Sequence, residues 1–274
     1  MKADRPGPVA VALAALVAVF LLLPLVAVIP VSFTPTRYLS VPAGEWSLRH
    51  YETLVTNPAW GRGVWLSIRI GLLSATVATA LALLFSLGIW MMRPAFAGVL
   101  MGFVLLPMVA PPVVSAVTLY FFLISLGQLN TIVAYDTWAG VALAHAVMIA
   151  PFAVVLITVA LSQVDRRIDL AARSMGAGLW TRVVHVILPN IRFGVLTAFF
   201  LTFVLSWEEI GVTLFITSVN ALTLPRLMWM GLRDNIDPAI AAISVVLIAI
   251  VVAVILIRTL VGALAARRAA REAL

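Results

Sequence analysis

The sequence contains no cysteine and only three histidines, which excludes disulfide bonds, iron–sulfur clusters and thiolate metal sites. Charged residues are also scarce, at 11% of the 274 residues, whereas 64% are hydrophobic. A soluble domain has about 25% charged residues and could not cover this much apolar surface. The chain is therefore predicted to lie in a lipid bilayer, and a metal site is not expected.

No motif in the chain is typical of catalysis. The sequence has no glycine-rich phosphate-binding loop and no nucleophile elbow. No polar segment places a pair of carboxylates beside a histidine. The chain is therefore not expected to act as an enzyme by itself or to bind a cofactor of its own.

Long apolar runs predict an all-α, polytopic membrane protein. A bilayer core about 30 Å thick takes about 20 apolar residues for each helical crossing. Three prolines in the third run, Pro107, Pro111 and Pro112, should kink it. A short interfacial helix is expected over residues 48–55. One transmembrane domain over residues 1–274 would then have six crossings, at residues 8–33, 64–90, 95–126, 138–161, 193–215 and 239–257.

The basic residues are distributed unevenly over this topology. With six crossings both termini lie on one side of the membrane, and 12 of the 18 Lys and Arg residues fall on that side. Because cytoplasmic segments of membrane proteins carry an excess of Lys and Arg, both termini are predicted to be cytoplasmic. The formal net charge of +7 then reflects orientation, and a nucleic-acid partner is not expected.

The segment of residues 162–192 is the one long cytoplasmic loop in this topology, and its apolar residues have helical spacing. Small residues at Ala171 and Ala172 would let a short helix seat closely against a partner, and Gly176 would permit a sharp turn after it. The alternative is an amphipathic surface helix that only links two crossings.

The loop resembles the signature of ABC-importer permeases, which reads Glu-Ala-Ala, three residues, Gly, nine residues and Ile-x-Leu-Pro. Ala171, Ala172, Gly176, Leu188 and Pro189 match this pattern in register. The loop departs from this pattern in two ways: Leu170 stands at the position of the usual Glu, and Asp169 supplies a carboxylate one position earlier. The predicted coupling residues are Asp169, Leu170, Ala171, Ala172, Gly176, Leu188 and Pro189.

This resemblance implies the fold of a type I ABC importer permease in a bacterial inner membrane. It implies three partners: a dimer of ATP-binding subunits docked on the loop, a second permease subunit, and a periplasmic or extracellular substrate-binding protein. ATP and Mg would be bound by the ATPase. Segments such as residues 46–51, 222–225 and 237–244 are similar to the second permease of the spermidine/putrescine branch, as is the acidic pair after Ser206 and Trp207.

Two adjacent carboxylates, Glu208 and Glu209, fall within the fifth predicted crossing. A carboxylate in the membrane is costly, so each needs a cationic partner, a water-filled cavity or a proton. In the outer half of the membrane it would attract an ammonium group, and Trp207 could add a cation–π contact. These three residues are therefore candidates for the pathway of a cationic solute. The alternative is that the acids pair with Arg226 or Arg233 and hold an outer gate together.

The predicted function is ATP-driven import of a small cationic solute, such as the polyamines spermidine or putrescine. Another amine-bearing or small polar solute is an alternative. An ion-coupled secondary transporter is another, with Glu208 or His145 as proton carrier, although no internal repeat supports it. A lone histidine among small residues is more typical of a hydrogen bond between packed helices. A third alternative is a membrane scaffold whose loop binds a soluble partner.

Overall fold

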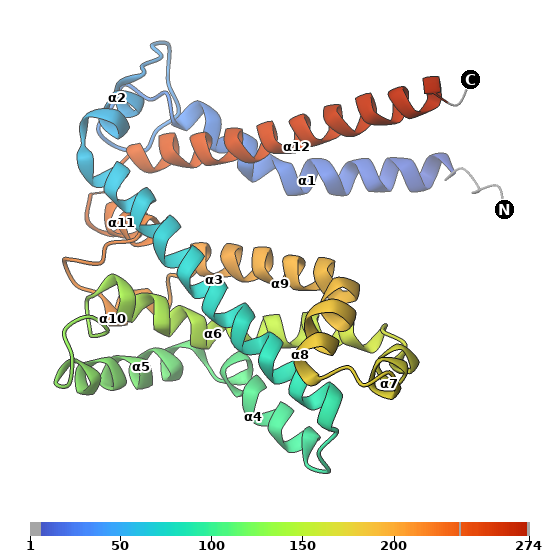
Figure 1. Cartoon of the computed structure of the whole chain (residues 1–274). Coiled ribbons are helices and arrows are strands. Elements are labelled where there is room, and N and C mark those ends of the chain that lie inside the picture. Colours follow the sequence, from blue (N-terminus) through green and yellow to red (C-terminus); the bar gives the residue numbers. More distant parts are fainter. Residues whose placement is uncertain (1–6, 236, 273–274) are drawn as a thin grey trace. The chain divides into compact units, whose positions relative to one another are not determined.

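The computed structural model describes residues 7–235 and 237–272 of the chain. Every regular element in these ranges is a helix, as the composition predicts. The two chain ends, residues 1–6 and 273–274, lie outside the described residues. The chain divides into a central unit, residues 62–227, and a terminal unit, residues 1–61 and 228–274, with boundaries that fall within helices α3 (Pro58–Met92) and α11 (Leu224–Met230) (Figure 1).

Within the described residues, five helices are long and apolar enough to cross a membrane, and a sixth span is possible if one bent pair of helices counts as a single span. This agrees with the expected six-crossing, all-α architecture. The long helices are α1 (Pro8–Val31), α3 (Pro58–Met92), α6 (Trp138–Ser162), α9 (Leu188–Glu208) and α12 (Ala239–Glu272), and the bent pair is α4 (Ala97–Val109) with α5 (Pro112–Gly127).

Helix α6 lies at the core of the central unit, where it packs against α9 and α4 (Figure 1). Small residues permit this close packing: Ala142 and Ala153 are buried, and Gly194 lies so close to Ala160 that a side chain at Gly194 would clash. Between membrane helices, such small residues let the backbones approach and gain van der Waals contact.

Hydroxyl groups also connect the helices of the central unit. Ser74 Oγ on α3 donates to the carbonyl oxygen of Ala142 on α6 at 3.0 Å, and the hydroxyl oxygens of Thr79 and Thr202 lie 3.4 Å apart between α3 and α9. These bonds satisfy polar groups that would find no water in a bilayer. The three helices are thus held by packing and by neutral polar contacts.

The third predicted crossing is broken where its prolines stand. Helices α4 and α5 meet at an angle of 99°. A proline pushes the residue before it out of the helical region, and both Ala110 and Pro111 precede a proline and have extended ψ angles of 140° and 132°. Pro107 remains inside α4. The expected kink is therefore a full break at residues 110–111.

The fifth helix departs from the expected range of 193–215 at both ends. Helix α9 begins at Leu188, with Pro189 in the first turn, where the missing N–H of proline is not needed. It ends at Glu208, after which Glu209 is extended and residues 211–212 form a turn that leads into the short helix α10 (Thr213–Ile216). The apolar composition continues across this turn, so hydropathy could not reveal the end of the helix.

The terminal unit contains α1, α2 (Arg49–Thr56) and α12, which contacts both of the others. Helix α1 has no buried residue, and an all-apolar helix left uncovered in this way is suited to contact with lipid. The short helix expected near residues 48–55 is present as α2. Its Tyr51 hydroxyl lies 2.7 Å from Ser32 Oγ at the end of α1, which ties the two helices together.

Candidate functional site

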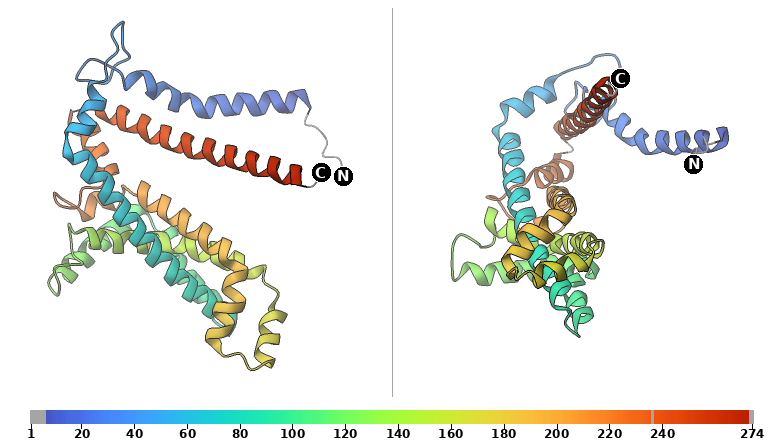
Figure 2. Two further views of the ribbon diagram at one scale, coloured as in Figure 1. Left: turned by 45° about the horizontal axis from the view of Figure 1, so that its top comes forward. Right: turned by 45° about the vertical axis from the view of Figure 1, so that its right-hand side comes forward.

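The loop between α6 and α9 is folded into three short helical segments: α7 (Arg166–Ser174), α8 (Leu179–Thr181) and η1 (Arg182–Ile187). Figure 1 and the left view of Figure 2 place this loop (yellow) beyond the ends of α6 and α9. Helix α7 begins after Asp165, whose Oδ1 accepts from the backbone N–H of Arg167 at 2.9 Å. The segment is therefore an ordered element, as its composition predicts.

Gly176 ends α7 with a sharp turn. Its φ angle is +80°, in the left-handed region that glycine adopts without steric cost. The N–H of Ala177 bonds to the carbonyl of Ala172, and the N–H of Gly176 to that of Arg173, which is the Schellman pattern of a helix end. Gly176, which matches the glycine of the ABC-permease signature, thus makes the sharp turn that its residue type predicts.

Asp169 forms an ion pair with Arg182 inside the loop. Arg182 Nε donates to Oδ1 at 2.7 Å and Nη2 donates to Oδ2 at 2.6 Å, and both side chains are 11% exposed. A two-pronged bond of this kind fixes orientation as well as distance. The carboxylate of Asp169, which precedes the position of the usual Glu, therefore points into the loop, where it joins α7 to η1.

The loop exposes four large apolar side chains. Leu170, at the position of the usual Glu, is 56% exposed, and Met175, Leu179 and Trp180 are more exposed still. Ala171 is also exposed, whereas Ala172 is buried. Among the other predicted coupling residues, Leu188 and Pro189 lie in the first turn of α9, separate from these side chains.

The acidic pair lies at the end of α9 rather than inside a continuous helix. Glu208 is the last helical residue and is exposed. Glu209 is extended, and its Oε1 accepts from the backbone N–H of Val212 at 2.8 Å. This bond satisfies a backbone donor just before α10 begins. The expectation that both acids occupy one helix is corrected by this turn. Trp207 is half-buried, with its ring 6.3 Å from that of Phe203.

Arg226 is not the partner of either acid. Its Nη1 donates to the carbonyl oxygens of Thr213 and Thr217, at 3.1 and 2.7 Å, and to the Thr217 hydroxyl. A guanidinium here satisfies carbonyls at the end of α10. Within the fully described residues 62–227, no ion pair involves Glu208 or Glu209, so the gate alternative finds no support from Arg226.

His145 joins α6 to this acidic turn through neutral hydrogen bonds. Its Nδ1 lies 2.9 Å from Ser206 Oγ and its Nε2 lies 2.8 Å from Thr213 Oγ1. The Thr213 hydroxyl donates to the carbonyl of Glu209 at 2.8 Å, so it must accept from His145 Nε2–H, and Ser206 must donate to Nδ1. The interpretation of His145 as a packing hydrogen bonder is confirmed.

Asp136, just before α6, is an anchoring residue that the sequence did not reveal. Its carboxylate accepts four backbone N–H groups, from residues 218 to 221, and the side-chain amide of Asn220. Partial burial raises the pKa of Asp136, but the hydrogen bonds from residues 218, 221, 220 and 219 outweigh it and leave this pKa below its usual value. A single aspartate with no motif around it carries no signal for this role.

No group of three or more His, Asp and Glu side chains gathers as metal ligands would within the described residues. The candidate residues instead lie at two separate sites in the central unit. One is the loop of α7, α8 and η1, with its internal ion pair and exposed apolar side chains. The other is the turn after α9, with an exposed carboxylate beside a tryptophan.

Comparisons with known proteins show similarity to one transport family. The family described as "Binding-protein-dependent transport system inner membrane component" matches residues 81–271. The putrescine transport system permease protein PotI of Escherichia coli K12 is 27% identical over 237 residues, 85% of this chain and 83% of the relative. A probable molybdenum ABC transporter permease protein of Haloferax volcanii is 35% identical over 184 residues, 65% of this chain and 68% of the relative.

Two further matches bear on fold and substrate. The molybdenum transport system permease protein ModB of Escherichia coli K12 is 33% identical over 192 residues, 64% of this chain and 81% of the relative. A solved structure titled "Crystal structure of an amino acid ABC transporter with histidines" matches with a TM-score of 0.54 and 18% identity, over 77% of this chain and 95% of that chain. At this identity the structural match supports the fold alone.

Proposed function

Because the chain belongs to the family of binding-protein-dependent transport system inner membrane components, and is thus an ABC-importer permease subunit, we propose that it carries a small organic cation of the polyamine class. Members of the family are membrane permeases, and ATP is hydrolysed by a separate subunit. The proposal includes the other parts of such a transporter: a second permease, an ATPase dimer that binds ATP and Mg, and an external binding protein. Both termini would face the cytoplasm.

The observation that carries the substrate class is the exposed carboxylate of Glu208. It lies at the end of a membrane helix, next to Trp207, and no cation of the central unit neutralises it. A carboxylate in a low-dielectric pathway favours a cation, and an aromatic face adds attraction for an ammonium group. The same charge would repel an oxyanion. PotI, named as a putrescine permease, matches over most of the chain.

An oxyanion is the rival substrate, because the molybdenum permeases are more similar in sequence, though over a shorter stretch. The test is uptake by proteoliposomes that hold the whole transporter and its binding protein, with labelled putrescine, spermidine and molybdate in parallel. We expect ATP-dependent, vanadate-sensitive uptake of a polyamine. Uptake of molybdate without polyamine would overturn the proposed substrate, and uptake driven by an ion gradient without ATP would indicate a secondary transporter.

We also infer that the loop of α7, α8 and η1 docks on the ATPase. Four exposed apolar side chains on a polar loop, those of Leu170, Met175, Leu179 and Trp180, form a surface of the kind that binds another protein. The ion pair between Asp169 and Arg182 joins α7 to η1, so that the two segments would move together. Nucleotide-driven closure of the ATPase would then shift α9 through η1, which continues directly into it.

Cross-linking tests this docking. A cysteine at Ser174, exposed on α7, should form an adduct with a cysteine-bearing ATPase in the assembled complex, since the natural chain has no cysteine to interfere. Thr118→Cys, exposed on α5, is the matched control and should form none. An intact complex in which both positions fail to react, or react equally, would contradict docking at the loop.

A further inference from the structure

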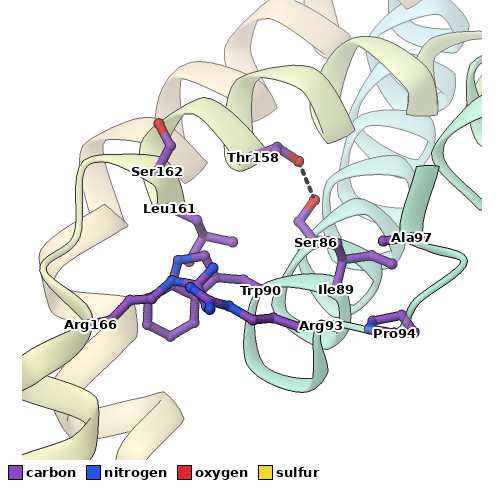
Figure 3. A pocket seen from close by; sticks show the side chains of 10 residues that line it. All are labelled: Ser86, Ile89, Trp90, Arg93, Pro94, Ala97, Thr158, Leu161, Ser162 and Arg166. Carbon is purple, nitrogen blue, oxygen red and sulfur yellow. Dashed lines mark hydrogen bonds between the residues drawn. The ribbon is translucent and has the colours of Figure 1, made fainter.

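A cavity of about 430 Å³ lies where the end of α3, the start of α4, the end of α6 and the start of α7 meet. Two arginines line it from opposite sides, Arg93 after α3 and Arg166 in α7. Figure 3 shows their side chains reaching toward each other across the cavity, over the ring of Trp90. All of its lining residues belong to the central unit, and none of them is among the side chains on which the functions proposed above rest.

No described carboxylate of the central unit forms an ion pair with either guanidinium group. The residues that line the cavity include no aspartate or glutamate. Within the fully described residues 62–227, the one ion pair joins Asp169 to Arg182, so neither Arg93 nor Arg166 has a carboxylate partner. Like charges that converge repel each other, and the repulsion is relieved when an anion lies between them. The arrangement is therefore suited to an anion that accepts hydrogen bonds from both arginines.

The rest of the cavity favours an amphiphilic ligand. The guanidinium of Arg166 lies 4.9 Å from the centre of the buried Trp90 ring, which holds this cation at the edge of an apolar floor. Ser86 is 2% exposed and its Oγ accepts from the Thr158 hydroxyl at 3.2 Å. Helix α4 begins at the cavity, which its first residue Ala97 lines, and it carries exposed apolar side chains that could lie along acyl chains: Phe96, just before it, and Val99 and Phe103.

The backbone at Arg93 is consistent with a position selected for its side chain. Its φ angle is +48°, a left-handed conformation that carries a steric cost for residues other than glycine. Glycine or asparagine is usual where a helix ends in this way. An arginine at the end of α3, followed by Pro94, places a cation at the membrane interface without extending the helix.

We propose that this cavity binds the phosphate group of an anionic phospholipid, held between Arg93 and Arg166, with its acyl chains along α4. Arginine suits this role because its planar donors bond two phosphate oxygens at once. The location at the ends of membrane-spanning helices places the two cations at headgroup level. A free phosphate ion would satisfy the same two arginines, but it would leave the apolar surface beside them unused.

Native mass spectrometry of the whole transporter tests the proposal, with phosphatidylglycerol and phosphatidylcholine of identical acyl chains as probes. We expect one retained phosphatidylglycerol in preference to phosphatidylcholine. Arg93→Gln together with Arg166→Gln should weaken retention by about tenfold, as expected for the loss of two charge-assisted contacts. Arg93→Gln alone, at an exposed position, should weaken it by a smaller factor without affecting assembly. Arg167→Gln, the exposed neighbour that does not line the cavity, is the matched control and should retain lipid as the wild type does.

Retention of phosphatidylglycerol by the double variant at the wild-type level would overturn the proposal. Inorganic phosphate, added alone to lipid-depleted complex, separates the two sources of the anion. Phosphate that binds without being displaced by phosphatidylglycerol would overturn the lipid assignment in favour of a free ion. Displacement of phosphate by phosphatidylglycerol, lost in the double variant, would support it.

Discussion

On either side of α6 the central unit is tied together by full charges, whereas the middle of the helix is tied by neutral groups. Asp136 holds the backbone of residues 218–221 before the helix, and Asp169 bonds to Arg182 after it. Between them, about 10 Å into α6 by helical rise, His145 links Ser206 and Thr213 without an ion pair. Water and headgroups at the helix ends tolerate charge, and the bilayer interior does not. The polar links therefore follow the polarity of their surroundings.

The largest effect is expected at Asp136. Asp136→Ala should leave several backbone N–H groups of residues 218–221 without an acceptor, at a cost of about 3 kcal/mol, since an unsatisfied buried donor such as that of Ala221 costs about 1–3 kcal/mol and the partly exposed ones cost less. The free energy of unfolding in mixed micelles measures this loss. Asp136→Asn keeps the shape and one acceptor oxygen, so it should cost less. Equal stability of the alanine variant and the wild type would show that the charged anchor contributes nothing.

The Asp136 anchor also has a pH signature. The pKa of Asp136 in the folded state lies below its usual value. Its contribution to the free energy of unfolding is therefore fully present above the unfolded-state pKa of about 3.9, and it is lost as the pH falls through the lower folded-state pKa. The stability difference between wild type and Asp136→Asn should therefore be constant from pH 5 to 8 and shrink only in acid. A difference that changes near neutral pH would contradict this assignment.

The ion pair of the loop should show the next largest coupling. A double-mutant cycle with Asp169→Asn and Arg182→Gln should give a coupling free energy of about 1–2 kcal/mol, because the bond is two-pronged and mostly shielded from water. Arg173→Gln, exposed on the same helix, should not couple to Asp169→Asn. A coupling near zero would mean that the loop is ordered by its backbone alone.

Two glycines in the same loop test how much the backbone contributes to its order. Gly176→Ala should cost about 1 kcal/mol through strain alone, because its φ is +80° and no atom lies within 4 Å of an added side chain. Gly178→Ala is the matched control, since Gly178 has a φ of −66° and equally open surroundings. Thermal unfolding of both variants should show a loss for the first only, and equal melting temperatures would exclude the strained turn.

The smallest effect is expected for the neutral link in the middle of α6. A cycle of His145→Ala and Ser206→Ala should give a coupling of about 0.6 kcal/mol, the average for hydrogen bonds between membrane helices. This value should lie below that of the ion pair, measured in the same micelles. A larger coupling for His145 than for Asp169 and Arg182 would reverse the comparison between the middle of the helix and its ends.

The long helices and the loop turn could be predicted because their signals are local. Apolar length predicts α1, α3, α6 and α12, and the residue type of Gly176 predicts the conformation that it adopts. The prolines predicted a bend, but its size depends on Ala110 and Pro111 both preceding a proline. These features follow from a few neighbouring residues, so one sequence contains them.

The anchors could not be predicted because they join residues far apart in the chain. Asp136 meets a loop more than 80 positions away, and His145 meets Thr213 at a separation of 68. Hydropathy also concealed the end of α9, because the residues after Glu209 are as apolar as those before. Asp169 pairs with Arg182, 13 positions further along the chain; the residue type of Gly176 predicts the turn between them, but not which side chains meet beyond it.

The most direct test of the proposed substrate is the initial rate of ATP-driven putrescine uptake by proteoliposomes that contain the whole transporter, with Glu208→Gln in place of the wild-type chain. We expect a decrease of about tenfold, because the substitution removes an intramembrane charge with a functional role. Glu52→Gln, which removes an exposed acid from α2 that has no role in the proposed pathway, should leave the rate unchanged. Wild-type uptake by Glu208→Gln, in complexes that still hydrolyse ATP, would contradict a cation pathway at this carboxylate.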